Sequence, residues 1–230
     1  DGKAILLPAR ERNRRLAGQA LYQVDVATGN ATTLLEFPPD PSRLGLGSVT
    51  GIGGVMRSND DLIYVHDGTL RQRHLPSGRE VELYSDPGVA TRLLALSPTG
   101  TELAFAVNDS TDTVRPHPMR NLHDAGRFMI ASLEGGGVRE LCRVSGRGTI
   151  SNVDWSPDGR SVLFLRQHSD SGAVLWRVSR ESGDAEQVWE TERKVTAFAL
   201  SPDGNRAAYT TLNVDSEVWV MENLKSVLER

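Results

Sequence analysis

The sequence predicts an all-β fold, and three observations lead to that prediction. Glycine occurs 22 times and proline 11 times in 230 residues, which is typical of a chain with many turns. Amphipathic windows of helical length are hard to find, whereas short apolar runs of strand length recur throughout the chain. A turn-forming tetrapeptide is also repeated along the chain. Together these features favour many short strands joined by tight turns.

The repeated tetrapeptide reads Ser-Pro-Asp-Gly or a close variant. It occurs at 97–100, 156–159 and 201–204, while 1–2 matches its second half and 58–61 is a more divergent copy. Proline presets φ at the second turn position, and Asp and Gly accept the conformations that follow. Apolar runs flank each copy, so each copy predicts the turn of a β-hairpin.

A second strand–turn–strand pattern follows each hairpin. An apolar residue stands eight positions before a glycine, and an apolar pair comes five and six positions after that glycine. The four instances are Leu21 and Gly29, Leu70 and Gly78, Phe128 and Gly136, and Leu175 and Gly183. Each repeat unit therefore holds four short strands. The third strands begin at 21, 70, 128, 175 and 218, at steps of 49, 58, 47 and 43 residues, which is typical of propeller blades.

The repeats thus predict a β-propeller of four-stranded antiparallel blades, with about five blades visible. We expect one propeller domain, or part of one, over residues 1–230, with units near 1–37, 45–86, 89–144, 147–191 and 193–230. The first unit begins inside a turn and lacks its innermost strand, so we expect the first blade to be incomplete.

The strand–Ser-Pro-Asp-Gly–strand pattern resembles the WD-like repeat of TolB-type β-propellers. The clearest copies are residues 153–164 and 198–209. The same repeat is found in tricorn-type proteins and in the propellers of prolyl-oligopeptidase-like peptidases. The resemblance implies six or more blades, so we expect the chain to be the C-terminal part of a longer protein. It implies architecture more than function, because one fold hosts many functions.

The alternation of strand direction predicts two different faces. The first-to-second and third-to-fourth turns share one face and are short, and we call it the tight-turn face. The other connections share the opposite face and hold nearly all the variable length, over 8–19, 37–50, 108–127, 167–172 and 211–216. Long loops on a rigid scaffold often carry function, so this loop-rich face is the predicted binding face. The alternative is that these loops are tolerated insertions.

Candidate binding residues lie in three of these loops: Arg12, Arg14, Arg15, His117, Arg120, His123, Asp124 and His168. The three arginines in the first loop could accept an acidic peptide or a phosphate, or could simply be solvated. The histidines of the 108–127 loop, with Asp109 and Asp112, match no metal-ligand spacing. His168 precedes Ser169 and Asp170, but a catalytic triad is recognised by geometry and not by adjacency.

Several functions are disfavoured by the sequence. The net charge of -4 argues against a dedicated nucleic-acid binder, and no run approaches the roughly 18 apolar residues of a membrane helix. The single cysteine, Cys142, excludes a multi-cysteine zinc site and is expected to fill the core. No Gly-x-Ser-x-Gly motif occurs, and residues 51–54 are expected to form a turn beside a strand. We therefore expect no cofactor and no metal.

The leading hypothesis is a non-catalytic binding or scaffold module that presents its loop-rich face to a protein or peptide partner. The alternative is the propeller domain of a larger enzyme, prolyl-oligopeptidase-like or tricorn-like, which gates an active site outside this chain. A small molecule at the propeller axis, with or without catalysis, is a third hypothesis. The sequence does not favour one cellular compartment.

Overall fold

The structure is a computed structural model that describes residues 4–10, 19–37, 53–109, 122–168, 172–201, 203–204 and 206–211. Among these residues it contains strands and turns and no helix. The strands are β1 (Ala4–Arg10), β2 (Gln19–Asp25), β3 (Ala31–Phe37), β4 (Gly53–Met56), β5 (Asp61–His66), β6 (Thr69–His74), β7 (Glu80–Ser85), β8 (Val89–Leu96), β9 (Glu102–Asn108), β10 (Leu122–Ser132), β11 (Val138–Trp155), β12 (Ser161–Gln167), β13 (Ala173–Ser179), β14 (Ala185–Thr191), β15 (Val195–Leu200) and β16 (Ala207–Thr211).

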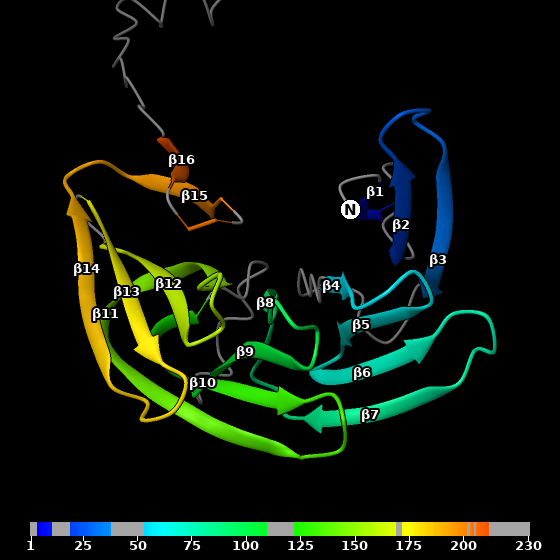
Figure 1. Ribbon diagram of the computed structural model, residues 1–230, viewed down its shortest axis with the longest axis horizontal. Helices are drawn as coiled ribbons and strands as arrows, with labels where there is room; N and C mark the ends of the chain where they lie inside the picture. The colour runs from blue at the N-terminus through cyan, green and yellow to red at the C-terminus, as the bar shows by residue number, and fades with distance from the viewer. Residues whose placement is uncertain are drawn as a thin grey trace, which may run out of the picture.

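The strands form antiparallel sheets in sequence order, β1–β3, β4–β7, β8–β14 and β15–β16. In Figure 1 the sheets fan along an arc, with β1–β3 at one end and β15–β16 at the other. The strands β4, β8 and β15 lie toward the inside of the arc, and β3, β7 and β14 lie on its outside. The prediction of an all-β protein with four-stranded antiparallel blades is confirmed.

The seven-stranded sheet consists of two blades that share the long strand β11. From Val138 to Ser145 this strand pairs with β10, and from Asn152 to Trp155 it pairs with β12. Between these segments, Thr149 and Ile150 pair with both neighbours. The fourth strand of one unit therefore continues into the first strand of the next. We number the blades in chain order: β1–β3, β4–β7, β8 to the first half of β11, the second half of β11 to β14, and β15–β16.

A β-bulge recurs at the same repeat position in blades 1 to 4. The register shifts directly after the pairs Leu21–Leu35, Leu70–Tyr84, Phe128–Cys142 and Leu175–Trp189. The extra residue on the fourth strand is Leu34, Leu83, Leu141 or Val188. A bulge places two residues of one strand opposite one residue of its partner. The apolar pairs after each glycine in the sequence are these bulge positions, so the repeat extends to hydrogen-bond register.

The Ser-Pro-Asp-Gly turns share one hydrogen-bond pattern. The Ser156 hydroxyl accepts the N–H of Ser161 at 2.9 Å and donates to Asp158 Oδ1 at 2.6 Å. The turn glycine Gly159 donates its N–H to the Ser156 carbonyl and has φ of 69°, a conformation that favours glycine. Gly100 and Gly204 repeat this arrangement with φ of 71° and 70°. The predicted hairpin turns at 58–61, 97–100, 156–159 and 201–204 are confirmed, and the copy at 1–2 lies outside the described residues.

The hydrophobic core lies between successive blades. The largest cluster joins blades 3 and 4 around Phe128, Trp155 and Phe164, and a second joins blades 2 and 3 around Phe105. The clusters between blades 4 and 5 and between blades 1 and 2 are smaller. The outer strands β3, β7 and β14 are mostly exposed. Burying both faces of the middle sheets is what stacking of blades achieves.

The expectation that residues 51–54 form a turn beside a strand is wrong for Gly53 and Gly54, which lie within β4. A Cβ on Gly54 would lie 3.0 Å from the Ile63 carbonyl oxygen and 3.1 Å from Leu21 Cδ2. Glycine is therefore used here because blades 1 and 2 approach each other closely at this point.

Candidate functional site on the loop-rich face

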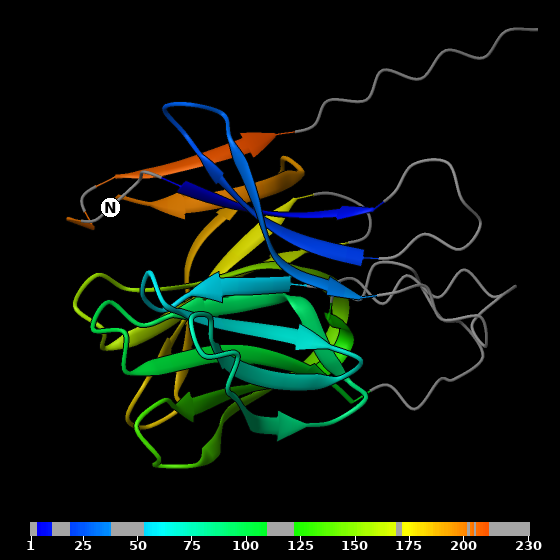
Figure 2. The ribbon, with the colours of Figure 1, turned by 90° about the vertical axis from the view of Figure 1, so that its right-hand side faces the viewer.

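The turns of the structure lie on two opposite faces. Hairpin turns such as 57–60, 97–101 and 156–160, together with third-to-fourth turns such as 133–137, gather at the left of Figure 2. The opposite strand ends carry the longer connections, of which 11–18, 38–52, 110–121 and 169–171 lie outside the described residues. The loops predicted at 8–19 and 108–127 are shorter than expected, because β1 continues to Arg10 and β10 already begins at Leu122.

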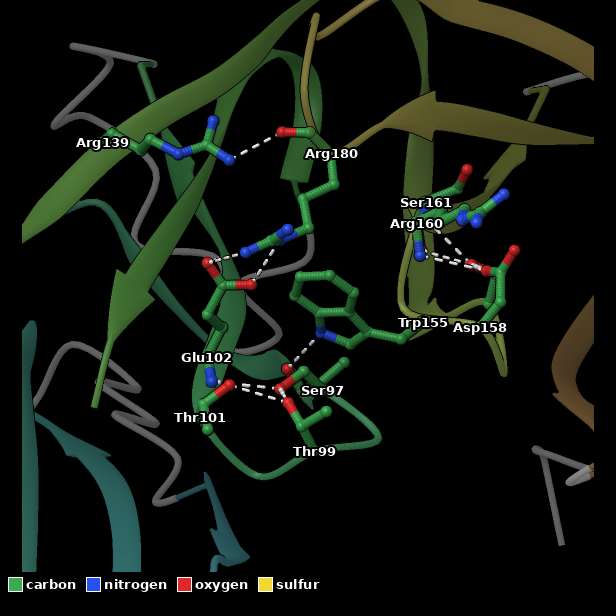
Figure 3. Close-up of polar contacts among 12 residues, drawn as sticks. Ser97, Thr99, Thr101, Glu102, Arg139, Trp155, Asp158, Arg160, Ser161 and Arg180 are labelled. Carbon is green, nitrogen blue, oxygen red and sulfur yellow. Dashed lines mark hydrogen bonds and ion pairs between the residues drawn. The ribbon is translucent and has the colours of Figure 1, made fainter. Parts of the chain in front are cut away.

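On the tight-turn face, arginines tie blades 3 and 4 together. Arg180 of blade 4 holds the Glu102 carboxylate of blade 3 with two hydrogen bonds of 2.6 and 2.9 Å (Figure 3). Arg139 of blade 3 donates in return to the Arg180 carbonyl at 2.6 Å. Hydrogen bonding to Glu102 raises the pKa of Arg180 further above its usual value. A two-pronged arginine–carboxylate pair fixes geometry as well as charge.

The innermost strands carry further links on this face. The buried indole of Trp155 donates from Nε1 to the Ala95 carbonyl of blade 3 at 2.9 Å (Figure 3). Asp154, its neighbour, accepts the backbone N–H groups of Trp155 and of Leu200 in blade 5, while its burial raises its pKa. Arg57 of blade 2 donates to the carbonyls of Gly100 and Leu133 in blade 3. These polar groups of the tight-turn face are thus used to join blades.

On the loop-rich face, a charged network joins blades 2 and 3. Arg127 Nε lies 2.6 Å from Asp109 Oδ1, and its Nη2 lies 3.2 Å from Asp86 Oδ2. Arg143 Nη1 reaches Asp109 Oδ2 at 3.3 Å, and the same guanidinium pairs with Glu140. Asp109 directly follows β9 and is the last described residue before 110–121, and Asp86 follows β7. We call Asp86, Asp109, Arg127 and Arg143 the loop-base network.

Three members of the loop-base network, Arg127, Asp86 and Asp109, are half-buried and expose 21%, 27% and 29% of their side chains, whereas Arg143 exposes 64%. Burial alone would lower the pKa of Arg127, but the hydrogen bond and charge of Asp109 outweigh it and raise the pKa. The carboxylate of Asp86 also accepts the Gly88 N–H at 2.7 Å. All four side chains are paired, so the network anchors the ends of strands and supplies no free acid, base or nucleophile for catalysis.

The structure brings only part of the predicted site into view. Arg12, Arg14, Arg15, His117 and Arg120 lie outside the described residues. His123 and Asp124 were expected in an irregular loop, which is wrong for their backbone, because both lie in β10 and His123 pairs with Thr149. Their side chains are outside the description. His168 is exposed and follows β12, at the loop-rich ends of the strands.

Local sequence patterns do not predict Asp86, Arg127 and Arg143 as members of one network. They indicate Asp109 only as an acidic neighbour of two histidines, and Arg127 only as the end of a loop. A signal was present, because Asp86 and Asp109 both directly follow strands that end at the same face. The pairing itself joins residues 41 and 18 positions apart for Arg127, a separation that local patterns do not reveal.

Within the described residues, no group of three or more His, Cys, Asp or Glu side chains could hold a metal ion. A search of the same residues for a helix long and apolar enough to span a membrane found none. Cys142 packs against the core between blades 3 and 4, and burial raises the pKa of its thiol to about 11. A thiol with so high a pKa is protonated at neutral pH and is a weak nucleophile.

No protein-family model matches the sequence, and no curated protein matches it. Solved structures, by contrast, share its fold. TolB from Acinetobacter baumannii is 17% identical with a TM-score of 0.58, and the match covers 83% of this chain and 42% of that chain. Porphyromonas gingivalis dipeptidyl peptidase 4 is 15% identical with a TM-score of 0.57, covering 90% of this chain and 35% of that chain.

A chain of the nidogen/laminin complex is 12% identical with a TM-score of 0.57, and the match covers 84% of this chain and 64% of that chain. The chain thus spans less than two thirds of the length of each of these three proteins. At such identities the likeness concerns the fold alone. The chain has a β-propeller fold, similar to the propellers of TolB and of dipeptidyl peptidase 4.

Proposed function

We propose that this chain is a non-catalytic β-propeller module that binds a protein or peptide through its loop-rich face. The observation that carries the proposal is the contrast between the two faces. On the tight-turn face, the side chains of Arg57, Arg139 and Arg180 form hydrogen bonds or ion pairs with a neighbouring blade. On the opposite face, the loop-base network supports the ends of strands that carry the longest connections. Long connections on a rigid scaffold are suited to recognition.

We also propose a propeller branch, a set of repeat units and a set of binding residues for this chain. The chain would belong to the TolB-like branch of propellers, as one domain with five repeat units at 1–37, 45–86, 89–144, 147–191 and 193–230. Arg12, Arg14, Arg15, His117, Arg120, His123, Asp124 and His168 would contribute to the binding face. The likeness to a chain of the nidogen/laminin complex supports a role in protein association, since that propeller is named for its complex.

Site-specific photo-crosslinking tests which face binds. A photoreactive amino acid at His168, which is exposed on the loop-rich face, is compared with one at Glu181, which is exposed on the tight-turn face. We expect a discrete crosslinked partner from position 168 in lysate of the source cells, lost when Arg12, Arg14 and Arg15 are changed to Glu. Equal crosslinking from both positions would contradict the proposal.

The second candidate is a propeller domain that gates the active site of a larger enzyme. It is favoured by the likeness to dipeptidyl peptidase 4, of which this chain spans 35%. The sequence of the gene beyond both ends separates the two candidates. A Gly-x-Ser-x-Gly motif in a neighbouring segment would favour the peptidase.

A further inference from the structure

A pocket between blades 1 and 2 is lined by the charged side chains Glu36, Arg71, Arg73 and Glu80. It has a volume of about 450 Å³ and is lined by β3 together with β5, β6 and β7. Its lining includes Tyr64 and the ring of Phe37, which stacks on His66 with centroids 3.8 Å apart. Arg71 and Arg73 enter the same pocket from β6. This pocket is separate from the loop-base network, which joins blades 2 and 3.

Arginine at these two positions departs from the repeat. The recurring bulge makes Arg71 equivalent to Met129 and Trp176, and Arg73 equivalent to Ala131 and Val178. In blades 3 and 4 these apolar side chains pack against the preceding blade. Among blades 2, 3 and 4, only blade 2 has two arginine side chains at these positions, facing the preceding blade. Placing a charge at such a junction costs free energy unless partners compensate it.

Arg73 has such partners. Its Nη1 lies 2.7 Å from Glu80 Oε1, and the same carboxylate oxygen accepts the Tyr64 hydroxyl at 2.9 Å. Burial, followed by the hydrogen bond to Glu80, raises the pKa of Tyr64 to about 12, so this hydroxyl stays protonated and donates. Burial opposes ionisation of Glu80, but the hydrogen bonds from Arg73 and Tyr64 prevail and lower its pKa. This trio is internally satisfied.

Arg71 is different. Its charge acts on Glu80 and Tyr64, but within the described residues its guanidinium makes no hydrogen bond or ion pair. It is only partly exposed, and a guanidinium carries five N–H donors in a fork that matches planar or tetrahedral oxyanions. The remaining carboxylate on the lining, Glu36, is exposed on β3. Arg71 therefore offers unused donors to the pocket.

We propose that the pocket between blades 1 and 2 binds a small oxyanion, a carboxylate or a phosphate group, with Arg71 as its principal ligand. Arg73 lies beside it, paired with Glu80, and the stacked rings of Phe37 and His66 form another part of the lining. The site is independent of the proposed partner-binding face, because it requires no protein partner and none of the residues assigned to that face.

Calorimetric titration of the whole chain with sodium phosphate and with sodium acetate, at constant ionic strength set by chloride, tests this site. We expect saturable binding of one or both anions, at least tenfold weaker in Arg71→Gln and only partly weakened in Arg71→Lys. Arg193→Gln removes an exposed arginine of the chain from another blade and should bind as the wild type does. Phosphate binding alone or acetate binding alone would identify which oxyanion the pocket takes.

Arg71→Met separates binding from folding, because it installs the residue found at the equivalent position of blade 3. This variant should unfold at a denaturant concentration no lower than the wild type without anion. The anion should raise the unfolding midpoint of the wild type and not that of Arg71→Met. Absence of saturable binding of both anions to the wild type, or equal binding by Arg71→Gln, would overturn the proposal.

Discussion

The tight-turn face and the loop-rich face both use arginine to link neighbouring blades, but in different structural settings. On the tight-turn face, Arg180 and Trp155 reach from one blade to the next and stand beside short, repeated turns. On the loop-rich face, Arg127 also crosses between blades, but it binds two aspartates at strand ends where the repeat pattern stops. The tight-turn face thus repeats one turn geometry and holds neighbouring blades together. The loop-rich face keeps the repeated geometry only up to the strand ends.

The largest expected effect concerns the tight-turn face. Trp155→Ala should lower the free energy of unfolding by about 3–5 kcal/mol, because it leaves a large cavity and removes the bond to Ala95. Trp189→Ala is the matched control, since that indole is 36% exposed, and it should cost less than half as much. Urea unfolding followed by fluorescence measures the free energy of unfolding of both variants. An equal decrease in the two would show that Trp155 stabilises the fold no more than an exposed tryptophan does.

An intermediate effect is expected for Arg127→Gln on the loop-rich face. It should cost about 1–2 kcal/mol, because Asp86 and Asp109 lose a half-buried partner. Arg180→Gln provides the matched change on the tight-turn face, and about 0.5–1 kcal/mol is expected because Arg180 is 47% exposed. Urea unfolding in low and high salt compares the two. A larger cost for Arg180→Gln would reverse the ranking of the two faces.

The smallest expected effect depends on pH and concerns Asp154. Burial raises its pKa in the folded chain above the unfolded value near 3.8. The folded state then holds the proton to higher pH, so its stability falls as pH rises through the interval between the two pKa values. The cost persists at neutral pH. Asp154→Asn, which retains an acceptor oxygen, should therefore be more stable than the wild type at neutral pH.

That advantage of Asp154→Asn should disappear below the interval, where both states of the wild type are protonated. Denaturant unfolding at about pH 3 and about pH 7 measures the difference. A constant difference between variant and wild type at the two pH values would exclude titration of Asp154 as its cause.

Much of the fold could be predicted from the sequence because its signals are local. The Ser-Pro-Asp-Gly turns need only the hydroxyl, the ring and the glycine of a few consecutive residues, and they recur with φ near 70° at Gly100, Gly159 and Gly204. The prediction that residues 51–54 form a turn failed at Gly54 for a non-local reason. Taken alone, glycine predicts a turn. At position 54 it instead leaves room for Leu21, which approaches from another blade.

The candidate site could be predicted less well. The sequence indicated the loop-rich face, and His168 is exposed there. The other residues it named lie outside the described residues or, as for His123 and Asp124, in a strand that begins earlier than expected. The loop-base network brings Asp86, Asp109 and Arg127 together through pairing of β9 with β10 and stacking of blades 2 and 3. Its members share no motif, and the position of Asp86 and Asp109 directly after strands does not reveal which arginine they meet.

By itself, the sequence determined the strands, the tight turns, the four-stranded repeat and the existence of two unlike faces. These follow from alternating strand direction and from backbone preferences that act within a few residues. Only the tertiary structure decided which charges meet. Arg180 finds Glu102 78 positions away, and Arg71 is left with unused donors at a junction where its counterparts are apolar. Such outcomes depend on how neighbouring blades pack, because long-range contacts fix the burial and the partners of each charge.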